Sequence, residues 1–384
     1  MIRSGSAADE RRMSTYLEAI GEIAENVVAR HAAQVDRDGS FPEFAIDAIR
    51  SERLLGLISA KEVGGMGEPA RAAALVVERL ARECGSTAMV MCMHYAAAAV
   101  IEAFAETQVR RELAAGEHLA TLAFSETGSR SHFWAPLGTA TKRDGSIRLD
   151  SKKSWVTSAS RATLYVWSSQ AVGKQGGCTL WLVPRATSGL LVHGSFDGLG
   201  LRGNDSTPVT ATAALIPESA RLGEDGIGLD IMLGTVLPIF NVITSACSVG
   251  LMAAATAAAT AHASETRYEH MNSKLADLPT LRAYIARMHI ATDQARCLLL
   301  DTLDALEGGR ADTMLRVLEC KATAGESATY VLDLAMRVCG GAAFRREVGV
   351  ERRFRDARAS TVMAPTTDQL YDFIGKAVCG LPLF

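Results

Sequence analysis

One stretch of the sequence decides the fold: Ala123-Phe124-Ser125-Glu126-Thr127-Gly128-Ser129-Arg130-Ser131. Its apolar start predicts the end of a β-strand, and the hydroxyl- and glycine-rich remainder predicts a loop directly after that strand. Such a loop can present backbone N–H groups and side-chain hydroxyls to ring oxygens and to phosphate. The stretch therefore predicts a ligand-binding loop at the edge of a β-sheet.

The residues around this loop have the pattern of a β domain. Short runs rich in β-branched and aromatic residues alternate with turn formers such as Asp144-Gly145 and Gly203-Asn204-Asp205. No βαβ alternation appears, so we expect antiparallel sheet between residues 119 and 224. The expected strands cover Ser146 to Leu149, Trp155 to Thr157, Leu164 to Trp167, Thr179 to Val183 and Val209 to Leu215.

Helical patterns flank this β domain on both sides. Residues 1–118 contain apolar residues at helical spacing and long Ala-rich runs, and residues 225–384 accommodate four long helices. The expected fold is mainly α with a central β domain, divided into a helical N-terminal domain (1–118), a middle β domain (119–224) and a C-terminal helical bundle (225–384). The four expected helices of that bundle run from Ile231 to His270, Leu278 to Glu307, Asp312 to Cys339 and Thr367 to Cys379.

Composition excludes several classes of protein. The chain has 384 residues, of which 48% are hydrophobic and 6% aromatic, so it can bury a large core. A net charge of -3 lacks the basic excess typical of nucleic-acid-binding proteins. The eight cysteines stand singly, without the spacing of a metal site or a redox pair. We therefore expect no metal, no nucleic-acid partner and a reducing, cytoplasmic location.

One segment is apolar enough to raise the question of a membrane. Residues Ile231 to Ser264 contain no Asp, Glu, Lys or Arg, but they include Pro238, Asn241 and His262. A helix buried on all sides in a protein core explains this composition better than a membrane span. The polar first residues, Met1 to Ser14, also lack the apolar core of a signal peptide.

Three further stretches accompany the loop at residues 123–131. They are residues 36–67 with Glu62-Val63-Gly64-Gly65, residues 144–158 with Lys152-Lys153-Ser154-Trp155, and Gly340-Gly341 followed by Glu351 to Ala357. The four together resemble the acyl-CoA dehydrogenase family of flavoproteins, in the order and spacing of that family. The resemblance covers nearly the whole chain and implies a helical N-terminal domain, a β-barrel-like middle domain, a C-terminal four-helix bundle and tightly bound FAD.

The resemblance also implies positions for the cofactor. The position of Thr157 reaches the flavin N5 edge, and that of Trp155 packs against the isoalloxazine. Gly340-Gly341 and Arg267 match residues that meet the FAD of a neighbouring subunit, which implies a homodimer or homotetramer. Read from the residues alone, Trp155 is equally an ordinary sheet aromatic, Gly340-Gly341 a helix C-cap and Arg267 a solvated charge. The full expected FAD set is Phe124, Ser125, Ser131, Trp155, Thr157, Arg267, Gly340, Gly341, Thr366 and Asp368.

The sequence departs from the family at the catalytic base. Members of the family remove a proton with a Glu that aligns with Ala364, or with Phe240 in some relatives. The neighbouring family Arg aligns with Asn241. A positioned base contributes roughly 10²- to 10⁴-fold to a rate, so ordinary fatty-acyl desaturation is disfavoured. Candidates for a milder base are Glu126, Asp368, His132 and His270, and the expected substrate contacts are Ser131, Phe240 and Asn241.

The expected function is that of an FAD-dependent oxidoreductase. Its expected substrate is a pantetheine-linked acyl thioester, carried by acyl carrier protein or CoA, in a specialised pathway such as alkoxy- or aminomalonyl extender-unit synthesis. Electrons would then leave to a separate acceptor. Three alternatives stay open: a flavin-dependent monooxygenase of the same fold, an ordinary acyl-CoA dehydrogenase with a relocated base, and a non-enzymatic flavoprotein.

Overall fold

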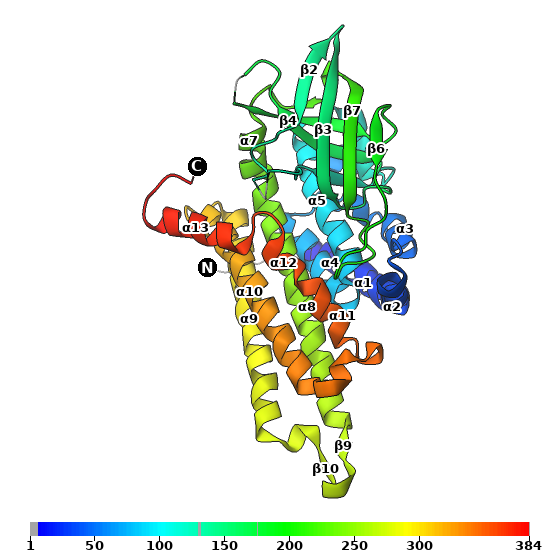
Figure 1. Cartoon of the computed structure of the whole chain (residues 1–384), viewed down its shortest axis with the longest axis vertical. Coiled ribbons are helices and arrows are strands. Elements are labelled where there is room, and N and C mark those ends of the chain that lie inside the picture. Colours follow the sequence, from blue (N-terminus) through cyan, green and yellow to red (C-terminus); the bar gives the residue numbers. More distant parts are fainter. Residues whose placement is uncertain (1–6, 130–131, 175, 384) are drawn as a thin grey trace.

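The computed structural model of the protein describes residues 7–129, 132–174 and 176–383. The molecule is elongated, with the β domain at one end of its long axis and three long helices, α8 to α10, along the rest (Figure 1). The N-terminal helices pack beside these long helices and against the β domain.

The N-terminal region consists of helices, as expected. Proline precedes two of them, Pro42 before α3 and Pro69 before α4, where its fixed φ suits a helix start and its missing N–H leaves no donor unpaired. The elements are α1 (Ala7–Ile23), the π turn η1 (Ala24–Val28), α2 (Ala29–Asp38), α3 (Glu43–Ser51), the 3-10 turns η2 (Leu54–Gly56) and η3 (Lys61–Val63), α4 (Ala70–Glu83), α5 (Gly85–Phe104) and α6 (Thr107–Ala114).

The middle region forms two sheets that share one apolar core. Within the described residues, the strand order is β1-β4-β5-β8 in one sheet and β2-β3-β7-β6 in the other. Trp167 and Trp181 lie in the core between them, fully buried. The strands are β1 (Ala120–Ala123), β2 (Thr139–Arg143), β3 (Ser146–Val156), β4 (Leu164–Gln170), β5 (Cys178–Pro184), β6 (Leu190–Val192), β7 (Thr207–Pro217) and β8 (Arg221–Leu222).

Two sequence expectations need correction here. The runs at 146–149 and 155–157 belong largely to one long strand, β3, which a register shift between Lys153 and Val156 bends near its end. The pairing is also not wholly antiparallel, because β1 pairs with β4 in parallel. The β2–β3 hairpin lies between β1 and β4 in the sequence but belongs to the other sheet. After this hairpin the chain comes back to the first sheet, and β4 runs beside β1 in the same direction.

The C-terminal bundle is built on α8 (Leu237–Glu265), which α7 (Gly228–Ile231) and the π turn η5 (Met232–Val236) precede. α8 packs on α4, α9 and α10. At Gly250 it approaches α4 so closely that a Cβ would lie 2.4 Å from the Glu78 carbonyl oxygen. The remaining elements are β9 (Arg267–Tyr268), η6 (Glu269–Met271), β10 (Ser273–Lys274), η7 (Leu275–Asp277), α9 (Pro279–Gly308), α10 (Thr313–Cys339), η8 (Gly340–Phe344), η9 (Arg346–Val348), α11 (Val350–Ala357), α12 (Ala359–Val362) and α13 (Thr367–Val378).

Two helical runs in the described chain are long and apolar enough to cross a membrane by length and composition. They are Gly85–Phe104 and Gly228–Glu265, and 72% and 89% of their most apolar windows are buried inside the protein. The charge-free segment from Ile231 thus lies where a core helix lies, packed among other helices. Most of the aliphatic side chains that α8 buries are Ala and Val.

Candidate active site

A cavity of about 80 Å³ lies between the β domain and the bundle. The β domain contributes the end of β1 with the loop after it and the end of β3. The bundle contributes η5 with the start of α8 and the link between α12 and α13. The lining residues are Met93, Leu122, Phe124, Ser125, Phe133, Ser154, Trp155, Val236, Leu237, Phe240, Ala364 and Pro365.

The β-domain wall presents a planar aromatic ring beside small polar groups. The Trp155 side chain is 70% exposed. Its backbone has φ 56°, which is unusual for a bulky residue and persists only where the surrounding structure holds it. The bend in β3 gives rise to this conformation. The Ser154 backbone N–H donates to the Ser125 carbonyl oxygen at 2.9 Å, which ties the binding loop to β3. Phe124 and Ser125, predicted to bind FAD, line the same wall.

Thr157 follows Trp155 in the sequence, but its side chain is buried. Its Oγ1 lies 2.9 Å from the Ser206 Oγ, and the residue is 3% exposed. The Thr157 hydroxyl is therefore engaged with Ser206, and Thr157 is not among the residues that line the cavity. Its predicted contact with the flavin N5 edge stays a prediction.

Glu126 belongs to the support of the binding loop. Its Oε1 accepts from the Lys153 Nζ at 2.7 Å, and both side chains are almost fully buried. Its Oε2 accepts from the backbone N–H groups of Leu137 and of Gly138, the latter at 2.9 Å. Both carboxylate oxygens are thus engaged and Glu126 does not line the cavity, so the structure offers no support for it as a base.

The bundle wall is apolar at Phe240 and Ala364, the two positions where the family resemblance implies a base. Phe240 is 7% exposed and lies one helical turn beyond the π turn η5, and Ala364 lies just before α13. A π turn inside a helix is a frequent feature of functional sites, because the extra residue redirects the side chains that follow. Here the residues that follow η5, Leu237 and Phe240, face the cavity.

Asn241 does not lie where a substrate contact was expected. Neighbouring helical residues point about 100° apart, so Asn241 faces α10 when Phe240 faces the cavity. Its Nδ2 donates to the Val317 carbonyl oxygen at 3.1 Å, and it is fully buried. Its Oδ1 is buried without a partner among the described residues. In the structure Asn241 thus makes a contact between helices, and its predicted contact with substrate stays a prediction.

The other base candidates, and Thr366 of the expected FAD set, also lie outside the cavity lining. Thr366 is the N-cap of α13 and accepts from the Gln369 backbone N–H, and Asp368 is exposed in the first turn of that helix. His132 has its Nδ1 2.9 Å from the Ser129 carbonyl oxygen, and His270 is exposed beside the β9–β10 hairpin. No described residue that lines the cavity carries an ionisable side chain.

The remaining predicted FAD residues lie apart from this cavity. Arg267 is exposed on β9, at the opposite end of the long axis from β2 and β3 (Figure 1). Gly340 and Gly341 are exposed, and nothing lies within 4 Å of a Cβ added at either. Both positions are therefore open to another molecule. Ser131, predicted for FAD and substrate, lies outside the described residues.

Some lining residues escaped the sequence reasoning. Met93, Val236 and Leu237 read as ordinary core residues in helical patterns, and no signal distinguished them. Phe133 carried a signal: two adjacent aromatics, Phe133-Trp134, directly follow a polar binding loop. In the structure Phe133 lines the cavity, while Trp134 packs on Phe373 of α13 at a centroid distance of 5.7 Å.

Comparison with known proteins identifies the family. Three family models match in order: "Acyl-CoA dehydrogenase, N-terminal domain" over residues 11–116, the middle domain over 121–213 and the C-terminal domain over 226–379. The chain belongs to the acyl-CoA dehydrogenase family. The human short-chain specific acyl-CoA dehydrogenase of mitochondria is a relative, 27% identical over 360 residues that cover 92% of this chain and 86% of the relative.

Solved structures share the fold over the whole chain. PigA with FAD and proline has a TM-score of 0.88 at 20% identity, covering 99% of both chains. The prolyl acyl carrier protein oxidase AnaB has a TM-score of 0.88 at 18% identity and covers 98% and 100%. FkbI, described for biosynthesis of a methoxymalonyl extender unit, has a TM-score of 0.85 at 22% identity and covers 94% and 99%. At these identities the likeness establishes the three-domain fold.

As a member of this flavoprotein family, the chain is an FAD-dependent oxidoreductase. The residues of the cavity fit a flavin. An exposed, conformationally constrained Trp155 offers a flat surface, Ser125 and Ser154 offer polar groups at its edge, and Phe240 and Ala364 leave an apolar space opposite. The confirmed parts of the sequence interpretation are thus the family, the fold and the cofactor class.

Proposed function

We propose that the protein oxidises a pantetheine-linked acyl thioester whose reacting carbon bears an O–H or N–H group, carried on an acyl carrier protein. One observation carries this proposal: no ionisable side chain lines the cavity in the described chain. Phe240 and Ala364 occupy the two positions where relatives place a carboxylate. A weakly acidic α C–H bond would need that base, whereas an O–H or N–H group loses its proton more readily.

The proposed step balances without a base from the cavity wall. The reacting C–H bond breaks and its hydrogen leaves with two electrons, a C=O or C=N bond forms, and the heteroatom keeps its proton until the product leaves the cavity and releases the proton to water. FAD, when bound, supplies the acceptor for the hydride. An aldehyde can enter the same step as its hydrate and leave as a carboxylate, as extender-unit synthesis requires. A separate protein or small molecule then accepts the electrons.

The chain's own residues position and shield the substrate. Trp155 and Phe124 hold the cofactor side of the cavity, and Phe133, Leu237 and Phe240 form an apolar surface on the acyl side. Excluding water from this space strengthens electrostatic interactions in it and prevents side reactions. AnaB, a prolyl acyl carrier protein oxidase, supports a carrier-bound acyl group for this chain, and FkbI, described for biosynthesis of a methoxymalonyl extender unit, supports an extender-unit pathway.

The assembly is also part of the proposal. Arg267 and Gly340-Gly341 are exposed and do not line the cavity of their own chain, which supports their completing the FAD site of a second copy. A homodimer or homotetramer would bring them there. The proposed location is the cytoplasm, where the buried free thiols stay reduced.

Anaerobic reduction tests this function. FAD-loaded protein is mixed with 2-hydroxy, 2-amino and semialdehyde thioesters, each on CoA and on acyl carrier protein, and the flavin absorbance is followed. We expect bleaching by the heteroatom-bearing acyl carrier protein thioesters. Bleaching by butyryl- or octanoyl-CoA at ordinary rates would refute the proposed substrate class. Oxygen incorporation into substrate with reduced flavin would favour a monooxygenase instead.

A further inference from the structure

A lysine without an acidic partner lies in the core of the bundle. Lys321 is on α10, is 2% exposed, and forms no ion pair with any described residue. Burying an ammonium group costs several kcal/mol unless polar groups replace its water. Burial accordingly lowers the pKa of Lys321 to about 7. Such a residue needs a structural reason for its position.

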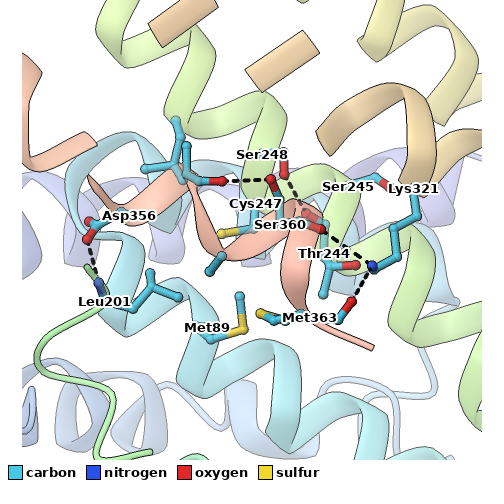
Figure 2. Close-up of a pocket in the computed structure, with 13 residues that line it drawn as sticks. Met89, Leu201, Thr244, Ser245, Cys247, Ser248, Lys321, Asp356, Ser360 and Met363 are labelled. Atoms are coloured by element: carbon cyan, nitrogen blue, oxygen red, sulfur yellow. Dashed lines mark hydrogen bonds between the residues drawn. The ribbon is translucent and has the colours of Figure 1, made fainter. Parts of the chain in front are cut away.

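Its partners are backbone carbonyls of the link that leads from α12 into α13. The Lys321 Nζ donates to the carbonyl oxygens of Pro365 at 2.6 Å and of Met363 at 3.0 Å, and lies 3.5 Å from that of Ser360. Figure 2 shows the side chain reaching across from its helix to this link. Hydrogen bonds from a charged donor are about twice as strong as neutral ones.

These contacts bracket Ala364. The carbonyls of Met363 and Pro365 stand on either side of it, so one ammonium group fixes the backbone both before and after this residue. Ala364 and Pro365 are also the residues that the link contributes to the wall of the active-site cavity. The next residue, Thr366, caps α13 and holds the link from its other end.

A small second cavity borders this contact and shares none of its described lining residues with the active-site cavity. Its volume is about 10 Å³, room for about one water molecule, and Lys321, Ser245, Ser248 and Ser360 are among its lining residues (Figure 2). Lys321 therefore contacts both this small cavity and the backbone of the active-site wall. Its side chain is the only cationic one among the described residues that line this second cavity.

We propose that Lys321 is a positioning residue: by holding the Met363 and Pro365 carbonyls, it fixes the Ala364–Pro365 wall against which the acyl group of the substrate lies. This inference rests on the proposed function for its effect on turnover. Its structural part, the clamped link, stands independently of any substrate. A misplacement of about 1 Å in a substrate-positioning wall costs on the order of 10²-fold in rate.

The test compares variants of the FAD-loaded protein. Lys321→Met removes the charge and the donors, Lys321→Gln is too short to reach the two carbonyls, and Lys321→Arg keeps the charge and the donors. Two neutral variants keep the test independent of whether one of them folds. Arg71→Ala serves as the control, because it removes the Glu307 and Asp304 contacts between α4 and α9, away from the cavity.

Two measurements decide the outcome. Hydrogen exchange of the amides in residues 360–366 should rise roughly tenfold or more in the Met and Gln variants, as expected for lost bonds to a charged donor. With the substrate that bleaches the wild type, kcat/KM should fall roughly 10- to 100-fold, and Arg should recover most of it. Arg71→Ala should change neither.

The two proposals fail in different ways. If no thioester bleaches the wild type, the proposed function fails, and the exchange measurement alone decides whether Lys321 clamps the link. Unchanged exchange in a folded, FAD-loaded Met or Gln variant would overturn the clamp. Raised exchange with unchanged kcat/KM would overturn its role in positioning the substrate, as would an equal effect of Arg71→Ala.

Discussion

The buried ion pair under the binding loop gives the sharpest test of the structure. Lys153 and Glu126 join at 2.7 Å with side chains that are 0% and 2% exposed. Lys153 also donates to the Ser168 carbonyl oxygen at 2.7 Å and lies 2.8 Å from its Oγ. Burial lowers the pKa of Lys153, and the carboxylate of Glu126 opposes this change.

The expected magnitudes follow from what each variant leaves behind. Lys153→Met leaves a buried carboxylate with only backbone donors, and should cost about 3–5 kcal/mol of unfolding free energy. Glu126→Gln leaves a buried ammonium group with Ser168. The double variant removes both charges, so its cost should be smaller than the sum of the two by about 1–3 kcal/mol. Lys142→Met, at an exposed pair with Glu218, should cost under about 1 kcal/mol.

Urea unfolding of the FAD-loaded variants measures these free energies. The fluorescence of Trp167 and Trp181 reports on the β domain, because both are fully buried in its core, and far-UV circular dichroism reports mainly on the helices. Additivity of the two single variants within about 0.5 kcal/mol would refute the coupling. A cost of Lys153→Met no greater than that of Lys142→Met would refute the buried pair itself.

Three further predictions concern the cavity wall and the exposed glycines. Ala364→Glu should speed flavin bleaching by butyryl-CoA roughly 10²- to 10⁴-fold in stopped-flow absorbance, because it places a carboxylate in the cavity wall; unchanged bleaching would contradict the proposed reason for the missing activity. Gly341→Ala should leave the urea unfolding of the isolated chain unchanged, since a Cβ there meets nothing within 4 Å, yet lower FAD affinity in an oligomer; equal FAD affinity would argue against the partner contact. The pKa of Lys321 is about 7 in the folded chain and lies below its value in the unfolded chain, so the unfolded chain binds more protons above pH 7. The free energy of unfolding of the wild type, relative to that of Lys321→Met, should therefore rise by roughly 1.4 kcal/mol per pH unit between pH 7 and 9.5. Below pH 7 this difference should not change. A difference that does not change with pH would contradict this burial; the subtraction removes the titration of Asp356, which lines the same small cavity.

The parts of the fold that sequence patterns could predict are those that local chemistry decides. The run from Ile231 carries no Asp, Glu, Lys or Arg, and most of its hydroxyls can bond to backbone carbonyls of their own helix, so its burial as a core helix follows from composition. The loop at residues 123–131 has both the strand end and the turn residues in one stretch. Parallel pairing of β1 with β4 was not predictable in this way, because it depends on where the intervening hairpin goes.

The roles of buried charges lay beyond the sequence for the same reason. Glu126 lies in the binding loop and is a candidate base by sequence. Its partner, Lys153, is on β3, which lies beside the loop only in the folded sheet. Lys321 stands in a helical pattern as an ordinary polar residue, and its three carbonyl partners lie about 40 residues away. Asn241 follows Phe240 by one residue on the same helix, and this step turns its side chain toward α10, whereas Phe240 lines the cavity.

The two departures from the family that line the cavity, Phe240 and Ala364, both lie on its bundle side, and this placement argues for a changed substrate. The β-domain side keeps Phe124, Ser125 and Trp155, together with the buried ion pair that supports their loop. The acyl side carries Phe240 and Ala364 instead of a carboxylate. A protein that had lost all redox function would have no need to keep one half of the cavity intact beside such changes. None of the described residues that line the cavity carries an ionisable side chain, so the proton that the reaction releases comes from the O–H or N–H group of the substrate itself. The substrate, on this argument, brings the acidity that the cavity wall lacks.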